Sequence, residues 1–69
     1  MATIKVIEVL AESEKSWEDA VQNAVTEASK SLHGIKSVWV KNLKAEVTDG
    51  KITIWGLNCK ISFELDGNR

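Results

Sequence analysis

The stretch that decides the fold, residues 51–65, reads Lys-Ile-Thr-Ile-Trp-Gly-Leu-Asn-Cys-Lys-Ile-Ser-Phe-Glu-Leu. Its odd-numbered positions are apolar from Trp55 to Leu65 without interruption, whereas its even-numbered positions are apolar at Ile52 and Ile54 and polar from Asn58 onward. Side chains of a strand point alternately to its two faces. This strand is therefore predicted to have one complete core face and a second face that is partly apolar.

The size of the chain limits what can cover that second face. With 69 residues, we expect a single domain over residues 1–69 with an ordered core at about 3–66. A domain this small buries only about 60% of its unfolded surface and usually needs a disulfide, a metal or a partner subunit. The single Cys59 cannot form an internal disulfide, and one Cys with one His does not make a usual zinc site. We therefore expect self-association.

Composition and charge exclude several partners. The net charge is −1, from 9 basic and 10 acidic residues, and no stripe of alternating Lys and aromatic residues suggests a nucleic-acid surface. The apolar runs are far shorter than the roughly 20 residues that cross a bilayer, and no signal peptide is visible. We expect no nucleic-acid or membrane partner. The lone thiol of Cys59 favours a reducing, cytoplasmic location.

The first half of the chain predicts a strand followed by a helix. Residues 3–10 are rich in Ile and Val and predict a strand, and residues 11–15 read as a polar connector. Ser16 is a good helix N-cap, and an apolar stripe at helical spacing runs from there to about Leu32. Gly34 is expected to cap the C-terminus in the left-handed conformation, with His33 in the last turn.

The second half predicts a β-hairpin. Residues 35–47 read as a strand, and Asp49-Gly50 suits a two-residue type I′ turn. If Thr48 pairs with Lys51, paired positions sum to 99, so Val38 faces Ile61 and Val40 faces Cys59, unless a bulge shifts the register. Residues 66–69 are expected to form a solvated tail.

Together these elements predict an α+β fold of order β-α-β-β, with one three-stranded antiparallel sheet packed on one amphipathic helix. The helix is expected to cover the odd-numbered face of residues 51–65, with Trp17 and Trp55 in the core. Nothing in the chain remains to cover the other face, which should mark an interface or a ligand groove. On this register the other face carries Ser37, Trp39, Leu43, Ala45, Val47, Ile52, Ile54, Gly56, Lys60 and Ser62.

No arrangement of residues indicates catalysis. No nucleophile with a neighbouring base, Gly-rich phosphate loop or His/Glu zinc spacing is present, so we predict a protein that is not an enzyme, with no catalytic and no metal-binding residues. Glu46, Thr48 and Asp49 could offer oxygens to a cation, but a solvated turn explains them more simply, and they do not fit an EF-hand loop.

The whole pattern resembles the dodecins, which are small β-α-β-β flavin-binding proteins that assemble into hollow dodecamers. The resemblance rests on the opening Ile-Lys-Val-Ile-Glu-Val, on Ala-Glu-Ser-Glu-Lys-Ser-Trp-Glu-Asp-Ala leading into an Ala-rich helix, and on the final Cys-Lys-Ile-Ser-Phe-Glu-Leu-Asp. It covers about residues 3–66 without gaps. It implies a homo-oligomer, expected to be a dodecamer, that holds a flavin (FMN, FAD or riboflavin) or a similar planar small molecule between subunits.

The family's flavin-contacting residues are not matched here. Dodecins stack flavin on a Trp near the start of the second strand and bind its edge with a Gln in the third; Ser37 and Gly56 occupy these positions. Trp39 points the same way two residues further on, about 7 Å along the strand, and could either take over the stacking or fill the space that flavin would occupy. Lys44 lies where some relatives place a basic group near the flavin phosphate. The candidate ligand-binding residues are Trp39, Ser37, Lys44 and Gly56, and the candidate interface residues are Leu43, Val47, Ile52 and Ile54.

Two main hypotheses follow. In the first, the protein is a non-enzymatic binding and storage assembly in which Trp39 stacks on flavin or another planar ligand. In the second, a dodecin-like assembly has lost flavin binding and has a structural or ion-binding role, with Trp39, Leu43 and Ile54 packed against symmetry mates. A flavin-dependent enzyme is a third hypothesis, and it lacks an acid or base placed beside a ring.

Overall fold

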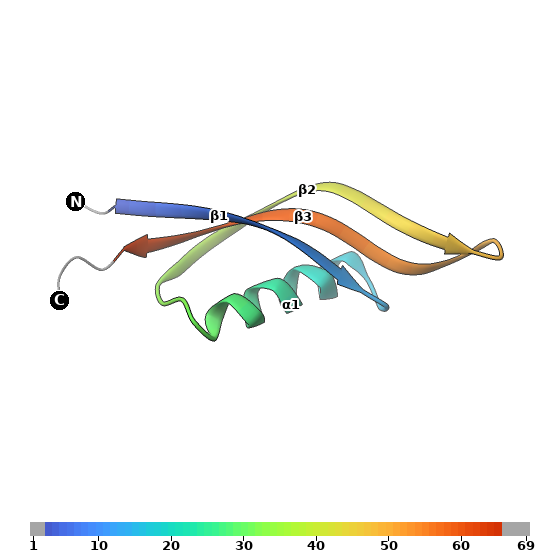
Figure 1. Ribbon diagram of the computed structural model, residues 1–69, viewed down its shortest axis with the longest axis horizontal. Helices are drawn as coiled ribbons and strands as arrows, with labels where there is room; N and C mark the ends of the chain where they lie inside the picture. Colours follow the sequence, from blue (N-terminus) through green and yellow to red (C-terminus); the bar gives the residue numbers. More distant parts are fainter. Residues whose placement is uncertain (1–2, 66–69) are drawn as a thin grey trace.

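The computed structural model describes residues 3–65 and confirms the predicted β-α-β-β order. Strand β1 spans Thr3–Ser13, helix α1 Trp17–Ser29, strand β2 Ile35–Thr48 and strand β3 Lys51–Leu65. The strands form one antiparallel sheet in the order β1-β3-β2, and α1 lies along one face of it (Figure 1). The tail prediction for residues 66–69 falls outside the described residues.

The hairpin forms as predicted at its turn and along its middle. Asp49 and Gly50 have φ angles of 54° and 77°, which a type I′ turn requires at both central residues. Thr48 pairs with Lys51, and further along the hairpin Val38 faces Ile61.

Bulges in β2 change one prediction. The register shifts between Lys41 and Lys44, where Asn42 adopts φ 56°, and again between Glu46 and Val47. Between these two shifts Ala45 pairs with Trp55. Ala45 therefore shares the helix side of the sheet, and its predicted place on the uncovered side is wrong.

Helix α1 begins where predicted and ends earlier. Ser16 is the N-cap, and its hydroxyl accepts a hydrogen bond of 3.0 Å from the Asp19 backbone N–H. The helix ends at Ser29, with Lys30 as its C-cap in the right-handed conformation, so the predicted end at Leu32 and the cap at Gly34 are wrong. Gly34 does take a left-handed φ of 72°, but in the connection to β2.

Strand β1 is longer than predicted because its end is fixed by side-chain hydrogen bonds. The hydroxyl of Ser13 donates to the Asp19 carboxylate at 2.6 Å and accepts from the Lys15 backbone N–H at 2.8 Å. These bonds satisfy a buried hydroxyl and join the strand to the first turn of α1, so the strand continues through residues 11–13, where a polar connector was predicted.

The core lies between α1 and the odd-numbered side of β3, as predicted. Trp55 is half-buried, whereas Trp17 is 36% exposed, so its predicted place in the core is wrong. Its indole N–H instead donates to the Lys44 carbonyl at 2.8 Å, beside the bulge at Asn42. The buried apolar residues are Ala11, Ala20, Leu57, Cys59, Ile61 and Phe63.

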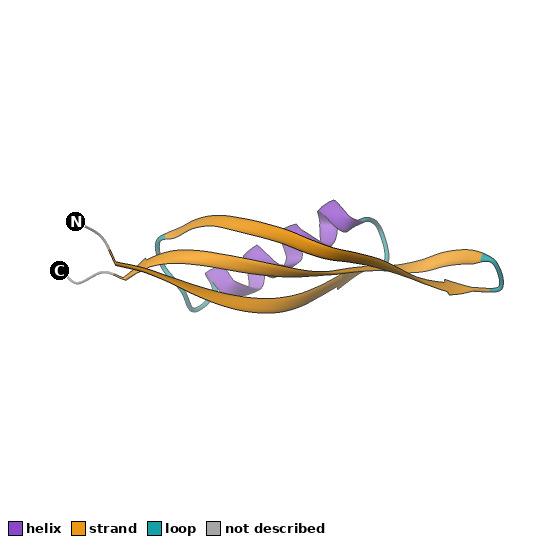
Figure 2. Ribbon diagram, turned by 90° about the horizontal axis from the view of Figure 1, so that it is seen from above, coloured by secondary structure: helices purple, strands orange, loops and turns teal. Residues whose placement is uncertain are grey.

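The molecule is elongated, with extents of 53 × 20 × 13 Å. The β2–β3 hairpin runs beyond the N-terminal end of α1 as a two-stranded arm that no helix covers (Figures 1 and 2). Val47 and Ile52 pair with each other on this arm and are 62% and 47% exposed. An apolar, two-stranded arm is marginal alone in water, which agrees with a chain that associates with others.

Candidate functional site: the uncovered face of the sheet

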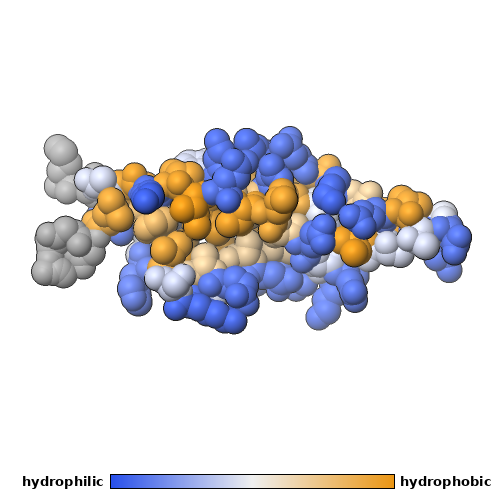
Figure 3. Space-filling model, viewed as in Figure 1, coloured by the Kyte–Doolittle hydropathy of each residue, from blue (hydrophilic) through white to orange (hydrophobic). Residues whose placement is uncertain are grey.

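The face of the sheet opposite α1 is the candidate site, and we call it the uncovered face. It combines exposed apolar side chains with charged ones, and hydrophilic side chains stand above an apolar band on this side in Figure 3. Strand pairing assigns it residues from all three strands. They are Ile4, Val6, Glu8, Leu10 and Glu12 of β1, Ser37, Trp39, Lys41, Lys44, Glu46 and Val47 of β2, and Ile52, Ile54, Gly56, Asn58, Lys60, Ser62 and Glu64 of β3.

Ser37 lies on this face as predicted and is joined to the central strand. It pairs with Ser62, and the two hydroxyl oxygens are 2.7 Å apart in a hydrogen bond. Ser62 is only 3% exposed, whereas Ser37 is exposed. The pair satisfies the buried hydroxyl of Ser62, while Ser37 itself is exposed.

Trp39 is the large aromatic side chain of the uncovered face. It pairs with Lys60 of β3, and 55% of it is exposed. Exposed indoles of this kind stack on planar ligands or anchor interfaces, because they bury a large apolar area at low conformational cost. Trp39 and Ser37 lie two residues apart on the same face and form one part of the candidate site.

Lys44 and Gly56 form the other part. They pair across β2 and β3, and the lysine side chain crosses above the glycine: a Cβ built on Gly56 would lie 2.9 Å from Lys44 Cε. The Lys44 ammonium lies 3.2 Å from a Glu46 carboxylate oxygen and 3.4 Å from one of Glu12. The hydrogen bond to Glu46, together with that to Glu12, raises the pKa of Lys44.

The four predicted ligand residues are therefore not gathered at one point. Gly56 lies four residues along β3 from Lys60, the partner of Trp39, which corresponds to about 13 Å. Trp39 and Ser37 form one group, and Lys44 and Gly56 another.

A second ion-paired group lies between these two. The Glu8 carboxylate is 3.6 Å from the Lys41 ammonium and accepts a 3.4 Å hydrogen bond from the Asn58 side-chain amide. Sequence reasoning missed Glu8 and Glu12 as members of this face, whereas it placed Lys60 on the face without giving it a role. Glu8 and Glu12 stand at even positions of β1, and this spacing shows that they share one face of the strand. Which face that is follows only from the β1–β3 register.

The predicted interface residues are largely exposed. Leu43 is 57% exposed and sits in the bulge between Lys41 and Lys44, so strand pairing gives it no partner on β3. Val47 and Ile52 lie on the arm, and Ile54 is half-buried beside them. That these residues contact other subunits stays a prediction.

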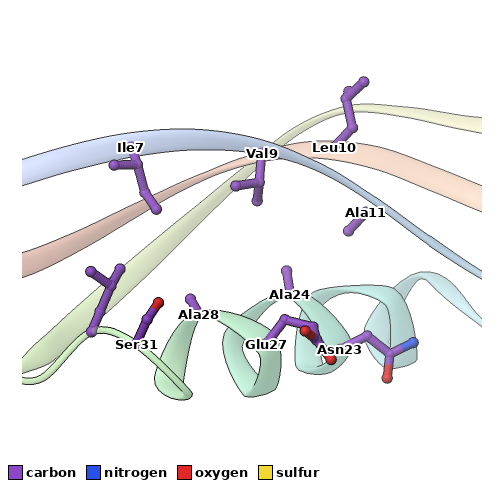
Figure 4. A pocket seen from close by; sticks show the side chains of 10 residues that line it. Ile7, Val9, Leu10, Ala11, Asn23, Ala24, Glu27, Ala28 and Ser31 are labelled. Atoms are coloured by element: carbon purple, nitrogen blue, oxygen red, sulfur yellow. The ribbon is translucent and has the colours of Figure 1, made fainter.

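A groove of about 490 Å³ lies on the other side of the sheet, between β1 and α1. In Figure 4, Ile7, Val9 and Ala11 point toward the helix, and Leu10 points away from it. Ala24 and Ala28 face the strand from below. The small helix side chains leave this hollow open, and it has no part in the candidate site.

These features define a class of protein: a small β-α-β-β chain whose sheet is covered on one face and open on the other. Comparison with known proteins gives the family. The Dodecin family pattern matches residues 3–66, so the chain belongs to the dodecin family. A search of curated protein sequences found no match.

Solved structures agree with this assignment. Dodecin from Streptomyces coelicolor is 31% identical, with a TM-score of 0.89 and coverage of 97% of this chain and 96% of that one. Dodecin from Streptomyces davaonensis is 28% identical, with a TM-score of 0.87 and coverage of 94% and 96%. A calcium-chelating antigen from Mycobacterium tuberculosis, calcium dodecin, is 29% identical, with a TM-score of 0.79 and coverage of 97% and 96%.

Family membership carries two functional statements. Dodecins are non-enzymatic ligand-binding proteins, and the family implies homo-oligomeric assembly. Over the described chain, no helix is long and apolar enough to cross a membrane. Among residues 3–65, no three His, Cys, Asp or Glu side chains come together as a metal site.

Proposed function

We propose that this dodecin is a binding and storage protein, a homododecamer that sequesters a flavin or a similar planar molecule between subunits without turning it over. The observation that carries the proposal is Trp39, an indole 55% exposed on the uncovered face of a dodecin-family sheet. Its ring offers the stacking surface that Ser37, at the family's stacking position, does not. The free, buried thiol of Cys59 is compatible with the reducing cytoplasm, where we place the assembly.

The geometry around Trp39 supports a ring-shaped ligand. Its neighbours on the face, Ser37 and Lys60, bring hydrogen-bonding groups to either side of the indole. A stacked aromatic pair gains about 0.5–1.5 kcal/mol beyond its buried area. In an oligomer, a second subunit can supply the opposite wall, so that the ligand is enclosed.

A flavin titration tests the proposal. Riboflavin or FMN is added to micromolar protein whose mass in solution has been measured, and flavin fluorescence is followed. Stacking on Trp39 predicts quenching, and Trp39→Ala should abolish it while the mass stays that of the wild type. Undiminished flavin fluorescence with the wild-type protein rejects flavin as the ligand.

The position of Lys44 favours a second candidate, an assembly with a structural role and no flavin. Its side chain fills the space above Gly56, so this part of the face has no room for a ring edge while the lysine stays there. In that case Trp39, Leu43 and Ile54 pack against symmetry mates. The same Trp39→Ala variant separates the candidates, because loss of a packed interface residue lowers the mass in solution rather than ligand affinity alone.

A further inference from the structure

We propose that the uncovered face selects planar aromatic anions, and that Lys60 is the cation that meets their negative group. This inference rests on the proposed function, since it takes Trp39 as the stacking surface. It adds the chemical class of the ligand: an aromatic ring system that carries a phosphate or a carboxylate.

The charges of the uncovered face single out Lys60. Its three lysines are Lys41, Lys44 and Lys60. Lys41 is paired with Glu8 at 3.6 Å, and Lys44 lies between Glu12 and Glu46 at 3.4 and 3.2 Å. Within residues 3–65, Lys60 has no carboxylate oxygen within 4.0 Å. It is the one lysine of this face whose charge is not matched in the described chain.

The carboxylate nearest in register to Lys60 is directed elsewhere. Glu8 pairs with Lys60 across β1 and β3, yet its carboxylate contacts Lys41 and Asn58 instead. A carboxylate that already has a cation and an amide donor gains little from a second cation. The Lys60 ammonium is thus left available to an anion from outside.

Lys60 is also next to the stacking surface. It is the direct partner of Trp39 in the β2–β3 ladder, so the two Cβ atoms are about 4.5–5.5 Å apart on the same face. Lys60 is half-buried on the central strand, and neighbours restrict its aliphatic stem. A ring stacked on Trp39 therefore has its edge or substituent within reach of the ammonium.

The hydroxyl pair on the other side of Trp39 completes the arrangement. Ser37 and Ser62 lie next to Trp39 and Lys60 in the ladder, and Ser37 is exposed, so its hydroxyl can bond a heteroatom of the ring. An indole platform, a cation and a hydroxyl along two adjacent strands match an anionic heteroaromatic ligand better than an uncharged hydrocarbon.

The test compares FMN with riboflavin, which differ by one phosphate. Dissociation constants are measured by fluorescence at low ionic strength for the wild type, for Lys60→Met and for Lys36→Met. Methionine keeps an aliphatic stem of similar length and removes the charge. Lys36→Met is the matched control, because it removes a lysine of β2 whose carboxylate partner is Glu64 and leaves the contact of Glu8 with Lys41 intact.

We expect the wild type to bind FMN about tenfold more tightly than riboflavin, as one charge-assisted contact predicts. Lys60→Met should bring the ratio close to one, Lys36→Met should leave it at the wild-type value, and added salt should reduce it. Equal binding of the two flavins by the wild type, or a preference that survives Lys60→Met, overturns the role of Lys60 and leaves the proposed function standing. Failure to bind either flavin rejects both.

Discussion

The side chain of Lys44 lies above Gly56, so that a Cβ added to the glycine would come within 2.9 Å of Lys44 Cε and 3.3 Å of Lys44 Cγ. Gly56 is buried, and its lack of a side chain is what allows the lysine to cross β3 and reach Glu12 on β1. The two residues are therefore a matched pair, and their effects on stability should not be additive.

A double-mutant cycle at Gly56 and Lys44 measures this coupling. A glycine within a strand costs about 0.5–1 kcal/mol relative to alanine. In the Lys44→Ala background, Gly56→Ala should therefore stabilise the protein by about that amount. In the wild type the gain should be lost, because the new methyl group displaces the lysine from Glu12 and Glu46. Chemical denaturation at fixed protein concentration gives the four free energies of unfolding.

Gly50→Ala is a control in which only the backbone matters. Gly50 has φ 77°, and nothing lies within 4 Å of an added Cβ. Its substitution should cost about 1–2 kcal/mol from left-handed strain alone, whatever residue stands at 44. If Gly56→Ala also changes the free energy of unfolding by the same amount with lysine and with alanine at position 44, Gly56 and Lys44 are not a matched pair.

Trp17→Phe should weaken the attachment of α1 to the bulge of β2. The variant keeps an aromatic ring but loses the indole N–H that donates to the Lys44 carbonyl at 2.8 Å. The expected loss is about 1 kcal/mol of unfolding free energy, with faster amide exchange in the segment 42–45. Trp39→Phe is the comparison, because within residues 3–65 the Trp39 indole N–H has no protein acceptor. Equal losses of unfolding free energy in the two variants would argue against a stabilising bond between Trp17 and the Lys44 carbonyl.

The sequence predicts the hairpin well because two independent signals agree there. Alternation over residues 51–65 separates the core side from the uncovered side, and Asp49-Gly50 fixes the turn and hence the register. Cys59 and Ile61 are fully buried as that alternation requires. Both signals come from neighbouring residues in the sequence, so the hairpin they predict does not depend on how α1 packs.

The bulge could not be predicted because a distant contact helps to set it. Asn42 has φ 56°, and asparagine tolerates this conformation better than most residues, but the same residue also fits a regular strand. The hydrogen bond from Trp17 to Lys44 spans 27 positions and lies beside the bulge. Ala45 was predicted on the uncovered face and Trp17 in the core, and both predictions are wrong for the same reason, which is the bulge and the Trp17 contact beside it.

The candidate site was predictable only where it follows from the hairpin. Ser37 and Trp39 were placed on the correct face through the β2–β3 register. The pairing of Lys44 with Glu12 and the isolation of Lys60 depend on β1, and no tight turn joins β1 to β3. A one-residue slip of β1 would move every one of its side chains to the other face, so the charge pattern becomes visible only in the structure.

Assembly should depend on the apolar arm of the hairpin. Val47 and Ile52 pair there at 62% and 47% exposure, and a lysine at either position would bring an unpaired charge into a subunit contact. Val47→Lys or Ile52→Lys should lower the mass in solution, as measured by light scattering. Thr48→Lys is the control, because it adds the same charge at a neighbouring polar position. A mass in solution that is unchanged in all three variants excludes the arm as an interface.

The thiol of Cys59 should make the protein less stable at alkaline pH. Cys59 is fully buried, and desolvation raises the pKa of its thiol above the ordinary value. Below the ordinary thiol pKa of about 8.5, the group is protonated in both the folded and unfolded states and stability is unaffected. Above it, the unfolded state releases the proton first, so the free energy of unfolding falls as pH rises.

Comparison of wild type with Cys59→Ala isolates this contribution. The variant should be less stable than the wild type at pH 7, because removing the sulfur leaves a small cavity. The difference between the two proteins should shrink as the pH rises past the ordinary thiol value, since only the wild type can ionise there. In the native protein the thiol should react slowly with a disulfide reagent and rapidly in denaturant. A stability difference that is constant over this range, together with fast labelling of the native protein, shows that the thiol is accessible and its pKa not raised.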